Sequence, residues 1–103
     1  MVTHIQNTPS SLNIAYAAVV SLGYTHSKLK ETFIGVNYPT LRSIRANKTL
    51  KKGTEQFYLS LFIDLIHKEY NRRISNGEDG SKYILVVMKN ILLAIKNEWE
   101  VKR

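Results

Sequence analysis

The side chains best suited to chemistry in this sequence lie between residues 38 and 45. Arg42 carries a forked guanidinium that can donate two hydrogen bonds to O6 and N7 of guanine. Ser43 can donate or accept a hydrogen bond at a base edge, Tyr38 can contact a thymine methyl group or a phosphate, and Pro39 permits close approach. Arg45 is suited to a phosphate. This combination of residue types is typical of a segment that contacts DNA.

The net charge of the chain is concentrated around the same segment. The 103 residues include 15 Lys or Arg and 8 Asp or Glu, so the formal net charge is +7. Residues 28–52 hold seven basic residues and one acidic residue, whereas the charges of residues 53–103 nearly balance. Clustered lysines and arginines favour a polyanionic partner. The candidate phosphate contacts in this stretch are Lys28, Arg45, Lys48, Lys51 and Lys52.

The sequence lacks the residue patterns of catalytic and metal sites. There is no cysteine, and the three histidines, His4, His26 and His67, are far apart in the sequence. Asp64 and His67 are spaced to share one side of a helix, but two ligands do not make a stable metal site. No glycine-rich phosphate loop or nucleophile motif is present. We therefore expect no enzyme activity, no catalytic residue, no bound metal and no cofactor.

The segment around Arg42 has the signals of a helix that buries one side. Asn37 can cap the first turn, and Pro39 falls where no backbone N–H is needed. The predicted helix runs from about Tyr38 to Ala46. Leu41 and Ile44 share one side of it and are expected in the core, which leaves the basic and small side chains on the other side.

A short helix is expected before this one, over residues 28–34, with Thr25 or Ser27 as its cap. Gly35 can adopt the left-handed backbone of a turn between the two helices. The alternative is a β-strand over residues 33–38, because their aromatic and β-branched content also suits a strand.

Three further helices are expected. One begins at Ser10 or Ser11 and ends near Leu22, where Gly23 can stop it. A long helix runs from Thr54 to about residue 74. After a turn at residues 75–80, a last helix runs from Ser81 to near residue 99. Apolar side chains cover much of both long helices, and in the last one lysines recur at every seventh position: Lys82, Lys89 and Lys96.

These elements predict an all-α fold of about five helices. Residues 1–10 are expected to form a flexible arm, and residues 11–103 a single helical domain. In that domain, residues 11–53 form a helix-turn-helix bundle and residues 54–103 a long C-terminal αα-hairpin. The hairpin has enough apolar surface for a homodimer through residues 54–99, although a monomer with a well-covered hairpin is equally compatible. No apolar run approaches the length of a membrane span, so we expect a soluble cytoplasmic protein.

The segment Gly35-Val36-Asn37-Tyr38-Pro39-Thr40-Leu41-Arg42-Ser43-Ile44 resembles the core of the lambda repressor/Cro-like (XRE-type) helix-turn-helix domains. The resemblance is good over residues 34–48 and loose over residues 12–66. It implies that Tyr38, Pro39, Arg42 and Ser43 face the bases. It also implies a phosphate contact at the start of the preceding helix, for which Thr25, His26 and Ser27 are candidates. Glu31 stands where the family usually has a small residue.

The expected function is sequence-specific binding of double-stranded DNA through a recognition helix in the major groove, as in a transcriptional regulator. The alternative is a helical protein–protein interaction module, or small adaptor, that acts through the C-terminal hairpin. An acidic partner would suit that alternative.

Overall fold

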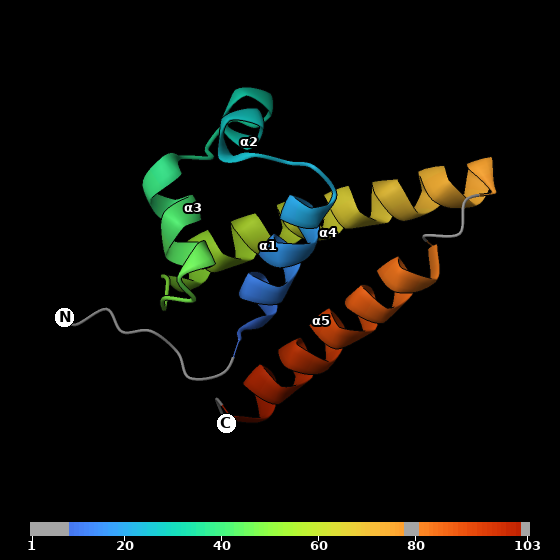
Figure 1. Cartoon of the computed structure of the whole chain (residues 1–103). Helices are drawn as coiled ribbons and strands as arrows, with labels where there is room; N and C mark the ends of the chain where they lie inside the picture. The colour runs from blue at the N-terminus through green and yellow to red at the C-terminus, as the bar shows by residue number, and fades with distance from the viewer. Residues whose placement is uncertain (1–8, 78–80, 102–103) are drawn as a thin grey trace.

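The computed structural model describes residues 9–77 and 81–101, and it confirms an all-α fold of five helices. Their bounds, in chain order (Figure 1), are α1 (Ser11–Ser21), α2 (His26–Thr32), α3 (Tyr38–Arg45), α4 (Lys52–Asn76) and α5 (Ser81–Val101). Most of the arm expected at residues 1–10 and part of the turn expected at residues 75–80 lie outside the described residues.

Side-chain caps fix the starts of the first two helices. The hydroxyl of Ser10 accepts a hydrogen bond from the backbone N–H of Asn13 at 3.0 Å, and that of Thr25 accepts one from the N–H of Lys28 at 3.1 Å. Each cap satisfies a backbone donor that has no partner within the helix. Gly23 follows α1 with φ +103°, as expected of a glycine that ends a helix.

Two predicted helix boundaries need correction. The helix expected over residues 28–34 is α2, which begins and ends two residues earlier, because Thr25 provides the cap and Phe33 leaves the helix with φ −123°. The helix expected from Thr54 begins at Lys52. The N–H of Glu55 bonds the carbonyl of Lys51 at 2.9 Å, which brings the preceding residues into the first turn. The β-strand alternative for residues 33–38 is wrong, since these residues form a turn and the start of α3.

Helix α1 lies at the centre of the molecule. It contacts α3, α4 and α5, and six of its eleven residues are buried: Ser11, Leu12, Ala15, Tyr16, Ala18 and Val19. In Figure 1, the two long helices diverge from the connection between them, and α1 occupies the space between their far ends. Helix α1 is therefore packed between α4 and α5.

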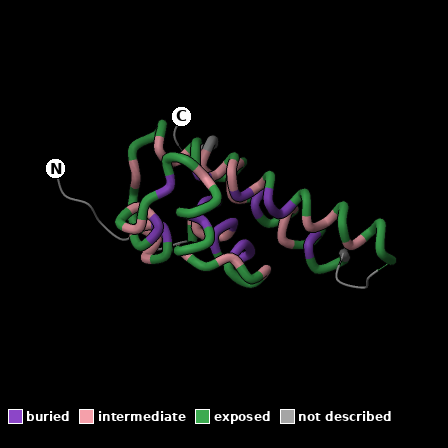
Figure 2. Tube along the Cα trace, turned by 90° about the horizontal axis from the view of Figure 1, so that it is seen from above, coloured by how far each residue is buried: buried purple, intermediate pink, exposed green. Residues whose placement is uncertain are grey.

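The core forms where α1 meets the long helices, and much of the remaining surface of those helices is exposed (Figure 2). Phe62 and Ile66 of α4 and Ile84 and Ile91 of α5 are at most 2% exposed. The polar residues Ser60, Asp64, His67 and Asn71 of α4 are exposed at the surface. None of the helices in the described part of the chain is both long enough and apolar enough to span a membrane.

Candidate nucleic-acid interface

The N-terminus of α3 is built as the sequence predicts. The side-chain oxygen of Asn37 accepts a hydrogen bond from the N–H of Thr40 at 2.9 Å, and Pro39 occupies the first turn. Proline has no N–H to leave unpaired there, and its fixed φ already suits a helix. The start of α3 is therefore set by residues within its own segment.

The C-terminus of α3 is closed by a left-handed residue. Asn47 has φ +56°, and the N–H groups of Asn47 and Lys48 bond the carbonyls of Ile44 and Ser43, each at 3.0 Å. Asparagine tolerates this conformation better than most residues that carry a Cβ. The side chain of Asn13, from α1, donates to the carbonyl of Ile44 at 2.9 Å. Both ends of α3 are therefore anchored, and α1 contributes to the second.

The turn between α2 and α3 is supported from α4. Gly35 has φ +94°, a left-handed conformation that glycine adopts without a steric penalty. The hydroxyl of Tyr58 donates to the carbonyl of Gly35 at 3.3 Å and accepts from the N–H of Asn37 at 3.1 Å. Phe57 packs against Gly35 and stacks edge-on with Tyr58. The two aromatic residues thus fix the backbone that leads into α3.

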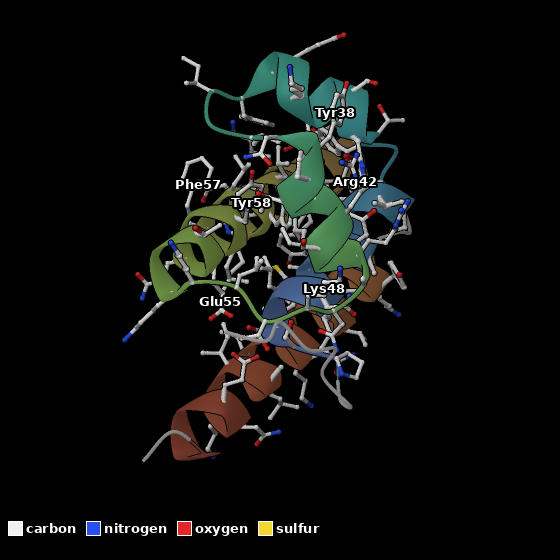
Figure 3. All side chains as sticks on the ribbon, turned by 90° about the vertical axis from the view of Figure 1, so that its left-hand side faces the viewer. Tyr38, Arg42, Lys48, Glu55, Phe57 and Tyr58 are labelled. Carbon is white, nitrogen blue, oxygen red and sulfur yellow. The ribbon has the colours of Figure 1, made fainter. Side chains whose placement is uncertain are left out.

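Helix α3 presents its charged side chains to solvent. Leu41 and Ile44 are at most 2% exposed, while Pro39, Arg42 and Arg45 are exposed and Ser43 is partly buried. Arg42 and Tyr38 lie on one side of α3, and Phe57 lies on the opposite side (Figure 3). The division into a buried apolar side and an exposed polar side agrees with the sequence prediction.

The side chain of Tyr38, the first residue of α3, contacts α2. Its hydroxyl donates to the hydroxyl of Ser27 at 3.4 Å, and the ammonium of Lys30 lies 5.5 Å from the centre of its ring. Tyr38 and Ser27 were predicted as a base contact and a phosphate contact, respectively, and the structure places them next to each other. Glu31, also on α2, is exposed, and Leu29 is the buried residue of that helix.

The other candidate phosphate contacts are spread over three segments. Lys28 is exposed on α2, with its ammonium 5.0 Å from the centre of the Tyr24 ring, and Thr25 is engaged as the cap of that helix. Lys48 is exposed just after α3 (Figure 3). Lys51 and Lys52 are exposed at the start of α4. The basic residues thus flank α3 in the sequence on both sides.

His26, a candidate phosphate contact, forms beside the two arginines a pair with Tyr16 that the sequence did not reveal. The hydroxyl of Tyr16, in α1, and Nε2 of His26, in α2, are 2.8 Å apart and share a hydrogen bond. Burial lowers the pKa of His26, and the positive charges of Arg45 and Arg42 lower it further. Burial raises the pKa of Tyr16, against a smaller opposing effect of Arg45. No local pattern signals this pair, because it depends on how α1 and α2 pack.

Within the described residues, no group of three or more His, Asp or Glu side chains is placed to hold a metal ion. His67 is exposed and shares a hydrogen bond with Asn71 rather than with Asp64. The fold and surface define a small five-helix domain with a basic, solvent-facing third helix. No family model, curated protein or solved structure matches this chain.

Proposed function

We propose that this protein binds double-stranded DNA sequence-specifically, with α3 in the major groove, and acts as a regulator of transcription. The observation that carries the proposal is the exposed pair Arg42 and Arg45 on a short helix whose Leu41 and Ile44 are buried. An α-helix fits the major groove, and arginine is the residue that most often reads guanine there. The resemblance of residues 34–48 to the lambda repressor/Cro-like helix-turn-helix supports the same assignment.

The rigidity of α3 supports a base-reading role. Asn37 caps one end of the helix, and Asn13 and Asn47 close the other. Tyr58 bonds the turn that precedes it. A helix that is already ordered loses less conformational entropy when it binds, so more of its contact energy appears as affinity.

The charge distribution supports binding to a polyanion. Glu31 is the only acidic residue between positions 9 and 54, against seven basic residues in that range. In this proposal Arg42, with Tyr38, Pro39 and Ser43, contacts base edges. The phosphate contacts come from residues at the end of α3 and on either side of it, namely Thr25, Ser27, Lys28, Arg45, Lys48, Lys51 and Lys52. Contacts of the second kind give affinity without sequence preference.

The test begins with fluorescence anisotropy on random duplex DNA. We expect micromolar binding that weakens steeply between about 50 and 200 mM salt, because each neutralised phosphate releases counterions. Selection from a random pool then supplies a specific site. On that site Arg42→Ala is expected to cost about 1 to 3 kcal/mol and to flatten the sequence preference.

Lys51→Ala provides the comparison. It is expected to weaken binding to every sequence alike and to reduce the slope of log affinity against log salt by about one. Lys68→Ala, which removes an exposed lysine of α4 outside the basic stretch of residues 28–52, is the control and should leave binding unchanged. Absence of DNA binding at all salt concentrations would refute the proposal. Equal losses for Arg42→Ala on all sequences would refute its base-reading role alone.

A further inference from the structure

The side of α5 that faces away from α1 is exposed and largely apolar. Ile84 and Ile91 are buried, whereas Leu85, Val86, Leu92 and Leu93 are between 49% and 63% exposed. Lys82, Lys89 and Lys96 are exposed as well. We call these four apolar residues and three lysines the outer face of α5.

The lysines run along the middle of the outer face. At 100° per residue, Lys82, Lys89 and Lys96 fall in one row, with the two leucines at 85 and 92 on one side and the apolar pair at 86 and 93 on the other. A row of charges between two apolar ridges repeats every seven residues, which is the repeat of a helix that pairs with another helix. Lys82 to Lys96 span about 21 Å of helix.

From this arrangement we infer that the outer face of α5 binds an amphipathic helix of another protein that carries acidic side chains at a seven-residue spacing. Apolar side chains of that helix cover the leucine and valine ridges, and its carboxylates pair with the lysine row. A lysine enclosed between two helices needs an opposite charge, because an unpaired buried charge is strongly unfavourable.

A second copy of this chain does not meet that requirement. If two copies paired through this face in antiparallel orientation, Lys89 would face Lys89 and Lys82 would face Lys96. In parallel orientation each lysine would face its own counterpart. No acidic residue lies between Lys82 and Lys96, and the carboxylate of Glu98, the next acidic residue along α5, is bonded to Ser11 of α1. Both arrangements therefore bring positive charges together.

A lipid surface also fits the outer face poorly. Helices that lie on a membrane bury a continuous apolar side and keep lysines at its margins. Here the lysine row divides the apolar side along its length. The outer face is also remote from α2, which lies at the opposite end of the molecule in the views of Figures 1 and 3. A partner on α5 could therefore bind without covering α2.

The proposal is tested with two synthetic helical peptides and the full chain. Both peptides have leucines that face the apolar ridges. One carries glutamate at every seventh position, and the other carries lysine at the same positions. Measured by fluorescence anisotropy, the glutamate peptide is expected to bind at least about tenfold more tightly than the lysine peptide, because facing like charges disfavour the second complex.

Charge reversal supplies the decisive comparison. The variant K82E/K89E/K96E is expected to lose binding to the glutamate peptide and to gain binding to the lysine peptide. Binding to the lysine peptide would also demonstrate that the variant is folded. The control K28E/K48E/K51E has the same change in net charge on α2 and the α3–α4 segment and should keep the preference of the unmodified protein. Equal or absent binding of the two peptides by the unmodified protein would overturn the inference.

Direct measurements test two other occupants of the outer face, a second copy of the chain and a lipid membrane. Sedimentation equilibrium should show a monomer, and a dimer that Leu92→Asp dissociates would assign the face to a second copy instead. In flotation with vesicles that contain phosphatidylserine, the outer face of α5 should not bind the vesicles. Recovery that K82E/K89E/K96E abolishes and K28E/K48E/K51E retains would assign it to a membrane and overturn the inference.

Discussion

Gly35 is the residue at which backbone conformation and side-chain packing meet in the turn before α3. Its φ of +94° disfavours any residue with a Cβ, and a Cβ built there would lie 3.2 Å from Cζ of Phe57. Gly53, in the first turn of α4, has no such constraint, since nothing lies within 4 Å of the equivalent position. The same Gly→Ala substitution can therefore be compared at a constrained position, Gly35, and at an unconstrained one, Gly53.

Gly35→Ala is expected to lower the free energy of unfolding by about 1 to 3 kcal/mol, through backbone strain and contact with Phe57. Gly53→Ala is expected to raise it by up to about 1 kcal/mol, because alanine favours a helix more than glycine does. Urea denaturation followed by circular dichroism measures both. A Gly35→Ala midpoint equal to that of the unmodified protein would show that the turn relaxes without cost.

The pKa of His26 makes stability depend on pH. Its pKa in the folded protein is lowered from 6.5 by burial and then by Arg45 and Arg42, so as pH falls the unfolded chain takes up the proton first. The contribution of neutral His26 is complete above about pH 6.5 and is lost as pH falls toward the folded pKa. Between about pH 7 and 5, the urea midpoint of the unmodified protein should therefore fall by more than that of His26→Gln.

An NMR titration of the His26 ring provides a direct check. The pKa of the ring should lie below 6.5, the ordinary value for histidine, in the free protein. If DNA phosphates approach Arg42 and Arg45 as proposed, they offset these positive charges, and bound duplex should raise the pKa of His26. A pKa unaffected by DNA that is demonstrably bound would place the phosphates elsewhere.

At the scale of elements, α4 supports the start of α3 through one hydroxyl group. Tyr58→Phe removes the acceptor of the Asn37 N–H and the donor to the Gly35 carbonyl. We expect the free energy of unfolding to fall by about 1 to 3 kcal/mol. Hydrogen exchange at the backbone N–H of Asn37 should become faster, and by more than the fall in the global free energy of unfolding explains.

Tyr83→Phe is the control for this change, because Tyr83 is 57% exposed on α5 and should tolerate loss of its hydroxyl. If both tyrosine variants have the same stability and the same exchange at Asn37, the turn does not depend on Tyr58.

The helices could be predicted closely because their ends are set by neighbours in the sequence. Ser10 and Asn37 accept hydrogen bonds from the backbone N–H groups three positions ahead, and Gly23 ends α1, so local reasoning places these boundaries well. The start of α2 was predicted two residues late, because the sequence did not decide between Thr25 and Ser27 as the cap. The burial of Leu41 and the exposure of the arginines also follow from helical spacing.

The contacts between elements could not be predicted in this way. The bonds from Asn13 to Ile44 and from Tyr58 to Gly35 join residues 31 and 23 positions apart. Neither partner has a local feature that identifies the other. The position of Tyr38 against Ser27 and the pairing of Tyr16 with His26 depend on the angles between helices, which the sequence pattern does not specify.

At the scale of the whole molecule, α1 and α5 are joined at the N-terminus of α1. The N–H of Ser11 donates to one carboxylate oxygen of Glu98 at 2.7 Å, and its hydroxyl donates to the other at 3.0 Å. A carboxylate is also stabilised at this position by the partial positive charge of the helix N-terminus. The contact connects residues 87 positions apart.

Glu98→Ala is expected to lower the free energy of unfolding by about 1.5 to 3 kcal/mol, since hydrogen bonds to a charged group are lost. Glu98→Gln should lose less, because the amide keeps one acceptor oxygen. Glu31→Ala, at an exposed site on α2, is the control. Urea denaturation of the three variants tests this order, and equal stability of Glu98→Ala and Glu31→Ala would contradict it.

The central position of α1 also bears on how the chain folds during synthesis. Helix α1 is synthesised before α4 and α5, against which it mainly packs, and Ser11 is synthesised before Glu98, to which it is hydrogen-bonded. Contacts between distant parts of a chain form late and slow the folding reaction. The apolar side of α1 therefore has no complete partner until α5 has been synthesised, and we expect it to be open to chaperones that bind exposed apolar segments until then.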